Sequence, residues 1–140
     1  MKLYHGTARA LGLGIEIGGL NPEGPFADLP PEFRPADRGK SGFSEEGYVY
    51  FFDDINRARH FACGSAFKVG FSMHGEIFEI DTNEVPVEKD PLMPSGSFRF
   101  KGKIPREKLK IAEKEVDCEK LGWGKKYWAR ELKLLGQMGL

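Results

Sequence analysis

The sequence predicts a single small α+β domain, and three observations support this prediction. The chain has 140 residues, which suits one domain with a hydrophobic core and is too short for two ordinary domains. Hydrophobic residues make up 40% of the chain and charged residues 30%, a composition typical of globular proteins. The strand-like segments cluster after a helical segment, and this order favours an α+β fold over a doubly wound sheet.

The first part of the chain predicts a strand, a short helix and a long loop. Residues 2–7 are expected to form a strand that turns at Gly6. The next segment fits a short helix or turn ending at Gly18 and Gly19, because four glycines there disfavour a long regular helix. Five of the nine prolines then fall in residues 21–46. We expect a long loop there, which is either a flap over a site or a disordered insertion.

The middle of the chain contains the clearest strand and helix signals. Residues 47–53 (GYVYFFD) are aromatic and are bounded by Gly and Asp, which indicates a strand. Asp53 or Asp54 is suited to cap the helix expected over residues 55–66. The helix is predicted by the spacing of its apolar residues, which are Ile55, Ala58, Phe61, Ala62 and Ala66.

The last part of the chain predicts three strands and a helix. Residues 76–81 form the first of these strands, with Ile77 and Phe78 on opposite faces. Residues 97–103 alternate between apolar and basic side chains, and residues 108–116 contain a last short strand. Residues 125–138 carry an apolar stripe at helical spacing, which indicates a C-terminal helix packed on the core.

Composition narrows the classes of partner and compartment. The chain has 21 basic and 21 acidic residues, and this balance gives no bulk signal for binding nucleic acid. The start MKLYHGT does not look like a signal peptide, and no run approaches the roughly 20 apolar residues of a membrane span. Cys63 and Cys118 lack the spacing of a metal site, so we predict no metal. Two reduced, partly buried thiols are the favoured state, and a single disulfide between them is the alternative. We therefore expect a cytoplasmic protein without a membrane partner.

Three motifs recur in a recognisable order along the chain. They are YHGT at residues 4–7, GYVYFFDDINRARHFA at residues 47–62 and SFRFKGKIPREKL at residues 97–109. Their order and spacing resemble the ADP-ribosyltransferase superfamily, in the branch that includes diphtheria toxin, poly(ADP-ribose) polymerases and tRNA 2′-phosphotransferases. The resemblance implies a split mixed or antiparallel β-sheet with short flanking helices and a C-terminal helix.

The same resemblance implies a function. It suggests that the chain uses NAD as a substrate and transfers a single ADP-ribose to an unknown acceptor, which is a protein, a nucleic acid or a small molecule. His5 corresponds to the histidine that binds ribose hydroxyls of NAD, and Thr7 adds a hydroxyl nearby. Gly6 has no Cβ, so the nicotinamide carboxamide is expected to approach its backbone closely.

Aromatic residues are expected to bind the nicotinamide ring. Tyr50 corresponds to the tyrosine that stacks on nicotinamide, although Tyr48 lies on the same face of the strand and is the alternative. Phe61 follows eleven positions after Tyr50, where related enzymes often place a second ring, and it is equally well explained as a core residue of its helix. Aromatic stacking contributes roughly 0.5–1.5 kcal/mol beyond burial.

The expected catalytic glutamate is missing from its motif position. Alignment on the Gly-x-Ile-Pro segment places Ser97 there, and a serine carries no charge to stabilise the transition state. Glu76 or Glu79 on the preceding strand, or Glu131 on the last helix, are the substitutes that the sequence offers. The candidate catalytic residues are therefore Tyr50, Glu79 and Ser97. A subtype resembling the RNA 2′-phosphotransferases would use Arg99 instead, so we also regard Arg99 as a candidate NAD-binding residue.

Two rival functions remain compatible with the sequence. The apparent loss of glutamate at Ser97 is consistent with a module that binds NAD or ADP-ribose without catalysis. The other rival is an interaction domain that binds no nucleotide, in which His5 and Tyr50 are structural residues. The transferase and the binding module both predict NAD binding, and only the transferase predicts release of nicotinamide.

Overall fold

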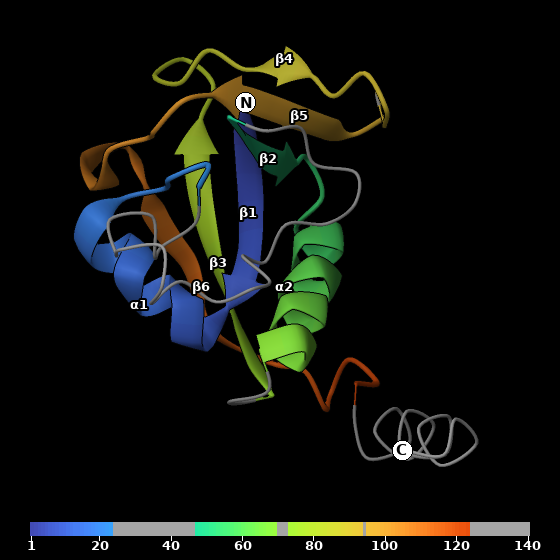
Figure 1. Cartoon of the computed structure of the whole chain (residues 1–140). Helices are drawn as coiled ribbons and strands as arrows, with labels where there is room; N and C mark the ends of the chain where they lie inside the picture. Colours follow the sequence, from blue (N-terminus) through green and yellow to red (C-terminus); the bar gives the residue numbers. More distant parts are fainter. Residues whose placement is uncertain (24–46, 70–72, 94, 124–140) are drawn as a thin grey trace, which may run out of the picture.

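The computed structural model describes residues 1–23, 47–69, 73–93 and 95–123 of the chain. Within them, six strands form one sheet and an α-helix lies on each face (Figure 1). In chain order the elements are β1 (Lys2–Ala8), α1 (Arg9–Gly18), β2 (Tyr48–Phe52), α2 (Ile55–Val69), β3 (His74–Asp81), β4 (Glu88–Lys89), β5 (Ser97–Lys101), the 3₁₀ turn η2 (Arg106–Lys108) and β6 (Lys110–Asp117). The predicted helix over residues 125–138, and residues 24–46 of the predicted loop, lie outside the described residues.

The sheet is antiparallel throughout, with strand order β4-β5-β2-β1-β3-β6. This confirms the α+β class predicted from the sequence. The central pairs are very unequal in length. β1 and β3 share seven register pairs and β2 and β5 share five, whereas β1 and β2 share one, Tyr4 with Phe52. We call this short junction between β1 and β2 the seam. In Figure 1, β5 runs across the page, whereas β1 and β3 run up and down it.

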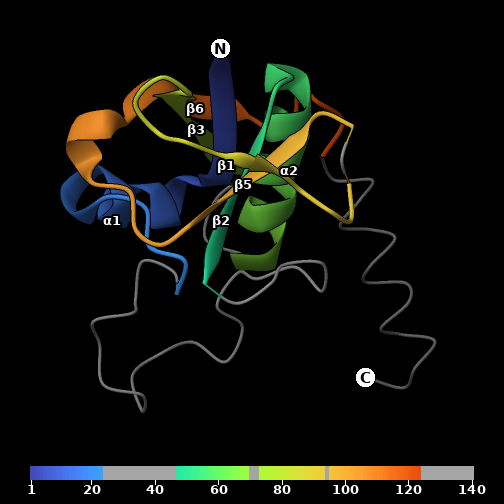
Figure 2. The same ribbon diagram turned by 90° about the horizontal axis from the view of Figure 1, so that it is seen from above.

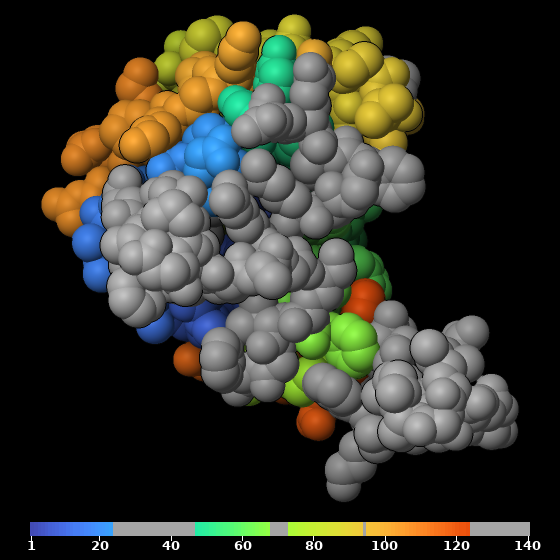
Figure 3. All heavy atoms as spheres, viewed as in Figure 1, coloured from blue at the N-terminus to red at the C-terminus, as the bar shows by residue number. Residues whose placement is uncertain are grey.

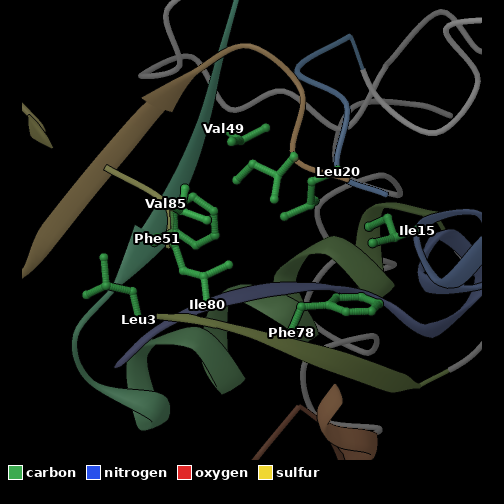
Figure 4. Close-up of a cluster of buried hydrophobic side chains, with 9 residues drawn as sticks. Leu3, Ile15, Leu20, Val49, Phe51, Phe78, Ile80 and Val85 are labelled. Atoms are coloured by element: carbon green, nitrogen blue, oxygen red, sulfur yellow. The ribbon is translucent and has the colours of Figure 1, made fainter. Parts of the chain in front are cut away.

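Each face of the sheet has its own hydrophobic core. α1 covers one face and α2 the other, as the view along the sheet in Figure 2 shows. The core on the α1 side includes Phe51 and Phe78, and the Phe78 ring extends toward Ile15 of α1 (Figure 4). The core on the α2 side includes Ile77 together with small residues of α2. Ile77 and Phe78 therefore lie on opposite faces of β3, as the sequence predicts.

The helices match their predictions in position and differ slightly in extent. α1 is short and ends at Gly18, as expected. α2 begins at the predicted Ile55 and extends to Val69, three residues beyond the predicted end. Asp54 is its cap, because Oδ1 of Asp54 accepts a hydrogen bond of 2.9 Å from the backbone N–H of Asn56.

The predicted turn at Gly6 is wrong, because β1 continues to Ala8 and pairs with β3 over its whole length. Gly6 serves close packing instead of a turn. A Cβ at Gly6 would lie 2.1 Å from the carbonyl oxygen of Ala58, so the missing side chain lets α2 rest directly on β1. The sequence also missed β4, which has two residues and is too short to show an alternating pattern.

The expectation of two reduced, partly buried thiols is wrong as well. Cys63 of α2 and Cys118, just after β6, form a disulfide with a Cα–Cα distance of 5.5 Å. Both side chains are fully buried in the core on the α2 side. A separation of 55 residues in the sequence hid this pairing, because it depends on β6 ending beneath α2.

Membrane insertion through a helix finds no support in the described residues. Neither α1 nor α2 is long and apolar enough to cross a bilayer.

Candidate functional site

His5 joins the two strands at the seam. Its Nδ1 lies 2.8 Å from the carbonyl oxygen of Tyr50, and because a carbonyl can only accept, Nδ1 carries the proton. The ring also makes an edge-to-face contact with Phe51, with centroids 5.8 Å apart. Burial lowers the pKa of the His5 imidazole below its ordinary value of 6.5, against the opposing effect of the Tyr50 carbonyl. The ring is therefore neutral at pH 7, and its Nε2 is left as a hydrogen-bond acceptor.

Gly6 and Thr7 continue β1 on the far side of His5. Gly6 is explained by its contact with α2, so packing gives a reason for glycine that is independent of any ligand. Thr7 is buried and pairs in register with Glu76 of β3. Thr7 alternates with Gly6 along the strand, so it shares the α1 side with His5.

The α2 side of β2 and β5 carries the remaining predicted polar residues. Tyr50 alternates with the buried Val49 and Phe51, so its ring faces away from the core that His5 contacts. Arg99 is the register partner of Tyr50, and Ser97 is its diagonal neighbour, at about 7–8 Å by strand geometry. Tyr50, Ser97 and Arg99 thus share one face, and His5 reaches Tyr50 through the backbone carbonyl alone.

Arg99 has strong partners of its own. Its Nε donates a hydrogen bond of 2.7 Å to Oε1 of Glu88, and its guanidinium lies over the ring of Tyr48, 3.9 Å from the centroid. The side chain is only 13% exposed. Tyr48 is therefore held by a cation–π contact with Arg99.

Phe61 is not the core residue that its helical spacing suggested. It is 42% exposed on α2, and its ring lies 5.5 Å from that of Phe52 at a tilted angle. Arg57 contacts the Phe52 ring of this pair, with its guanidinium 4.8 Å from the ring centroid. The structure therefore places Phe61 beside Phe52, on the same side of the sheet as Tyr50.

Ser97 is buried at the start of β5 and bonds to an acid that the sequence reading did not single out. Its Oγ donates a hydrogen bond of 3.2 Å to Oδ2 of Asp90, and the backbone N–H of Asp90 donates to the carbonyl of Ser97 at 3.0 Å. Asp90 is 5% exposed and also accepts a bond from the N–H of Leu92. The Asp-Pro step at residues 90–91 is a turn signal that points to such a contact.

Glu79 does not reach the predicted site. It faces Tyr4 across β1, and its carboxylate lies 3.9 Å from the Lys2 ammonium. Glu79, Tyr4, Phe52 and Ser97 occupy one register row across four strands. Glu79 and Ser97 are therefore three strand spacings apart, about 14 Å.

Glu76 lies on the side of β3 that faces α1 and is fully buried. Its Oε1 accepts a hydrogen bond of 2.8 Å from Arg9, and its Oε2 has no partner among the described residues. Arg9 also donates to Glu16 at 2.7 Å, so one guanidinium serves two carboxylates. Burial raises the pKa of Glu76 to about 7, although Arg9 opposes this shift. Gly12 makes room for this group, since a Cβ there would lie 1.8 Å from Oε1 of Glu76.

A pocket of about 290 Å³ lies beside α1, away from the residues that the sequence singled out. The pocket is formed by α1, β3 and the segment leading into β6. The blue surface of α1 and the orange surface of that segment adjoin in Figure 3. Its lining consists of four apolar and three charged residues, which are Ile15, Glu16, Phe78, Arg106, Glu107, Leu109 and Ile111. Its volume is at the lower end of the range for small-molecule sites.

Comparison with known proteins adds no assignment to this geometry. No protein-family model matches the chain, and no curated protein sequence matches it. The seam and its flanking residues are therefore interpreted from their own contacts and from the motif resemblance described above.

Proposed function

We propose that the chain binds NAD at the seam and transfers its ADP-ribose to an acceptor, with release of nicotinamide. The observation that carries the proposal is the hydrogen bond from His5 to the Tyr50 carbonyl. It unites the histidine and tyrosine motifs, which are 45 residues apart in the chain. It does so where the sheet has a single register pair.

The His5 contact also defines a chemical role for the ring. A neutral imidazole whose Nδ1–H is occupied presents Nε2 as a fixed acceptor, which suits the hydroxyl of a ribose. Within the described residues, β1 and β2 share only one register pair, so the seam is the shortest pairing in the centre of the sheet. Because His5 lies on the α1 side and the Tyr50 ring on the α2 side, one NAD molecule has to span the sheet at the seam to contact both residues.

The face shared by Tyr50 and Ser97 suits the reacting end of NAD. Tyr50 offers a ring for stacking on nicotinamide, and Ser97 is its diagonal neighbour. In the transfer, the bond between nicotinamide and ribose breaks and its electron pair leaves with nicotinamide. The ribose carbon that becomes electron-poor is attacked by a lone pair of the acceptor, which then loses a proton to solvent.

A binding module without catalysis is the second candidate, and one observation favours it. Ser97 carries no charge, and its hydroxyl proton is already donated to Asp90. An RNA 2′-phosphotransferase is less well supported, because Arg99 is bonded to Glu88 and stacked on Tyr48. Those contacts compete with any contact to a phosphate.

Substitution of the seam residues is the test of where NAD binds. His5→Ala removes the proposed ribose acceptor, and Tyr50→Ala removes the stacking ring. We expect each to weaken NAD binding about fivefold or more, since loss of one uncharged contact costs about 1 kcal/mol or more. Isothermal titration with NAD measures this, and the thermal unfolding midpoint of each variant verifies that it folds.

Tyr48→Ala is the matched control, because Tyr48 is two residues from Tyr50 on the same face of β2. We expect its NAD affinity to stay within about threefold of the parent, in line with its stacking on Arg99. Folded His5→Ala and Tyr50→Ala variants that bind NAD as tightly as the parent would place the ligand elsewhere.

A further inference from the structure

We infer that Ser97 and Asp90 act together in place of a single glutamate, with Asp90 as a positioning residue that acts through the Ser97 hydroxyl. This inference rests on the proposed function and specifies how the site would stabilise the transfer step. It begins from the contact between the two side chains, in which Ser97 Oγ donates to Asp90 Oδ2 at 3.2 Å.

The direction of that bond decides what Ser97 can do. A hydroxyl has one proton and two lone pairs. Because the proton is held by Asp90, and no described residue donates to Ser97 Oγ, the lone pairs of that oxygen are suited to accept from a ribose hydroxyl. In a site with a catalytic glutamate, the carboxylate would accept this hydrogen bond from the ribose. The bond to Asp90 makes the Ser97 oxygen more negative and so a better acceptor.

The burial of Asp90 favours a functional role for its carboxylate. Asp90 is 5% exposed, and within the described residues no Lys or Arg forms an ion pair with it. Its carboxylate accepts from the Leu92 N–H and the Ser97 hydroxyl. Ionising a buried carboxylate is costly, and Asn would close the same turn without that cost.

The position of the pair fits the same role. Ser97 lies on the face of Tyr50 and diagonal to it, so a nicotinamide on Tyr50 places its ribose toward Ser97. When the bond to nicotinamide breaks, positive charge develops on that ribose. A negative group held nearby in a site of low dielectric stabilises this charge in the transition state more than in the bound substrate.

The test replaces the charge while keeping the shape. Asp90→Asn retains a hydrogen-bonding group of the same size, and Ser97→Ala removes the hydroxyl. We expect each to slow nicotinamide release from NAD about 100-fold and to change the NAD dissociation constant by less than about threefold. We further expect Ser97→Glu to restore at least a tenth of the parent rate in the Asp90→Asn background, since it returns a carboxylate to the same place.

Asp53→Asn is the matched control. Asp53 is an exposed carboxylate at the end of β2, and its backbone N–H bonds to Gly96 beside Ser97. It should leave the rate of nicotinamide release unchanged. Unfolding midpoints are measured for every variant, so that a purely structural role for Asp90 is recognised by loss of stability without loss of rate.

The outcomes separate this inference from the proposed function. A folded Asp90→Asn variant that releases nicotinamide at the parent rate overturns the inference and leaves the proposed function standing. A parent protein that binds NAD and releases no nicotinamide also overturns it, while NAD binding at the seam survives. A parent protein that does not bind NAD overturns both.

Discussion

Loss of the disulfide between Cys63 and Cys118 is expected to lower the free energy of unfolding by about 4 kcal/mol. The bond closes a loop across 55 residues, and opening it restores conformational freedom to the unfolded chain. It also ties the middle of α2 to the end of β6 inside the core on the α2 side. For a domain of this size, such a change lowers the unfolding midpoint by on the order of 10 °C.

The measurement is thermal or urea unfolding of the parent protein with and without a reducing agent. The double variant Cys63→Ala/Cys118→Ala is the control, since the reducing agent should leave its stability unchanged. A thiol assay on the unfolded, unreduced parent should find no free thiol. Two free thiols together with an unchanged midpoint on reduction would show that the disulfide does not hold this fold together.

Structural disulfides are typical of oxidising compartments, so the same thiol assay also tests the expected cytoplasmic location.

Removal of Arg9 is expected to cost about 3–5 kcal/mol above pH 7, because it leaves the buried Glu76 carboxylate without a cation. Arg9 bonds to both Glu76 and Glu16, and Lys114 lies 3.9 Å from Glu16 on the outer side of the cluster. Arg9→Met keeps the apolar stem of the side chain and deletes its charge. The double variant Arg9→Met/Glu76→Gln removes both buried partners and should recover most of the lost stability.

The same cluster makes stability depend on pH in a defined direction. The pKa of Glu76 is raised to about 7 from an ordinary value of 4.5, mainly by burial. Between these two values the folded state holds a proton that the unfolded state has released. The free energy of unfolding therefore falls as pH rises from about 4.5 to about 7, by at most about 3 kcal/mol.

Other groups titrate in or near this window, so the Glu76 effect is best measured as a difference. The lowered pKa of His5 makes stability rise as pH increases toward 6.5, and Arg9 lowers the pKa of Glu16. We expect Glu76→Gln to remove the fall between pH 4.5 and 7 relative to the parent, measured by urea unfolding at several pH values. A Glu76→Gln variant with the same pH profile as the parent would contradict this assignment.

Local patterns in the sequence were sufficient for most of the fold. The aromatic run of β2, the alternation along β5 and the apolar spacing in α2 are each set by neighbouring residues in the sequence. The continuation of β1 past Gly6 was not predictable in this way. The continuation of β1 depends on the packing of α2 against it. This tertiary contact leaves no pattern in the sequence of residues 2–8.

The candidate site was predictable in part for the same reason. His5 and Tyr50 were singled out by motif, and their contact through a backbone carbonyl follows from the register of β1 and β2. Asp90 was overlooked because it lies outside the motifs and approaches Ser97 only across the β4–β5 hairpin. The exposure of Phe61 was hidden by a helical spacing that also fits a core residue.

The most direct test of the account is to titrate NAD into the unsubstituted protein and then assay the same mixture for free nicotinamide by chromatography. We expect saturable binding with one NAD per chain, followed by release of nicotinamide over time. Binding without release would leave a nucleotide-binding module and remove the transferase. No binding at millimolar NAD would contradict the central claim that the seam between β1 and β2 is an NAD site.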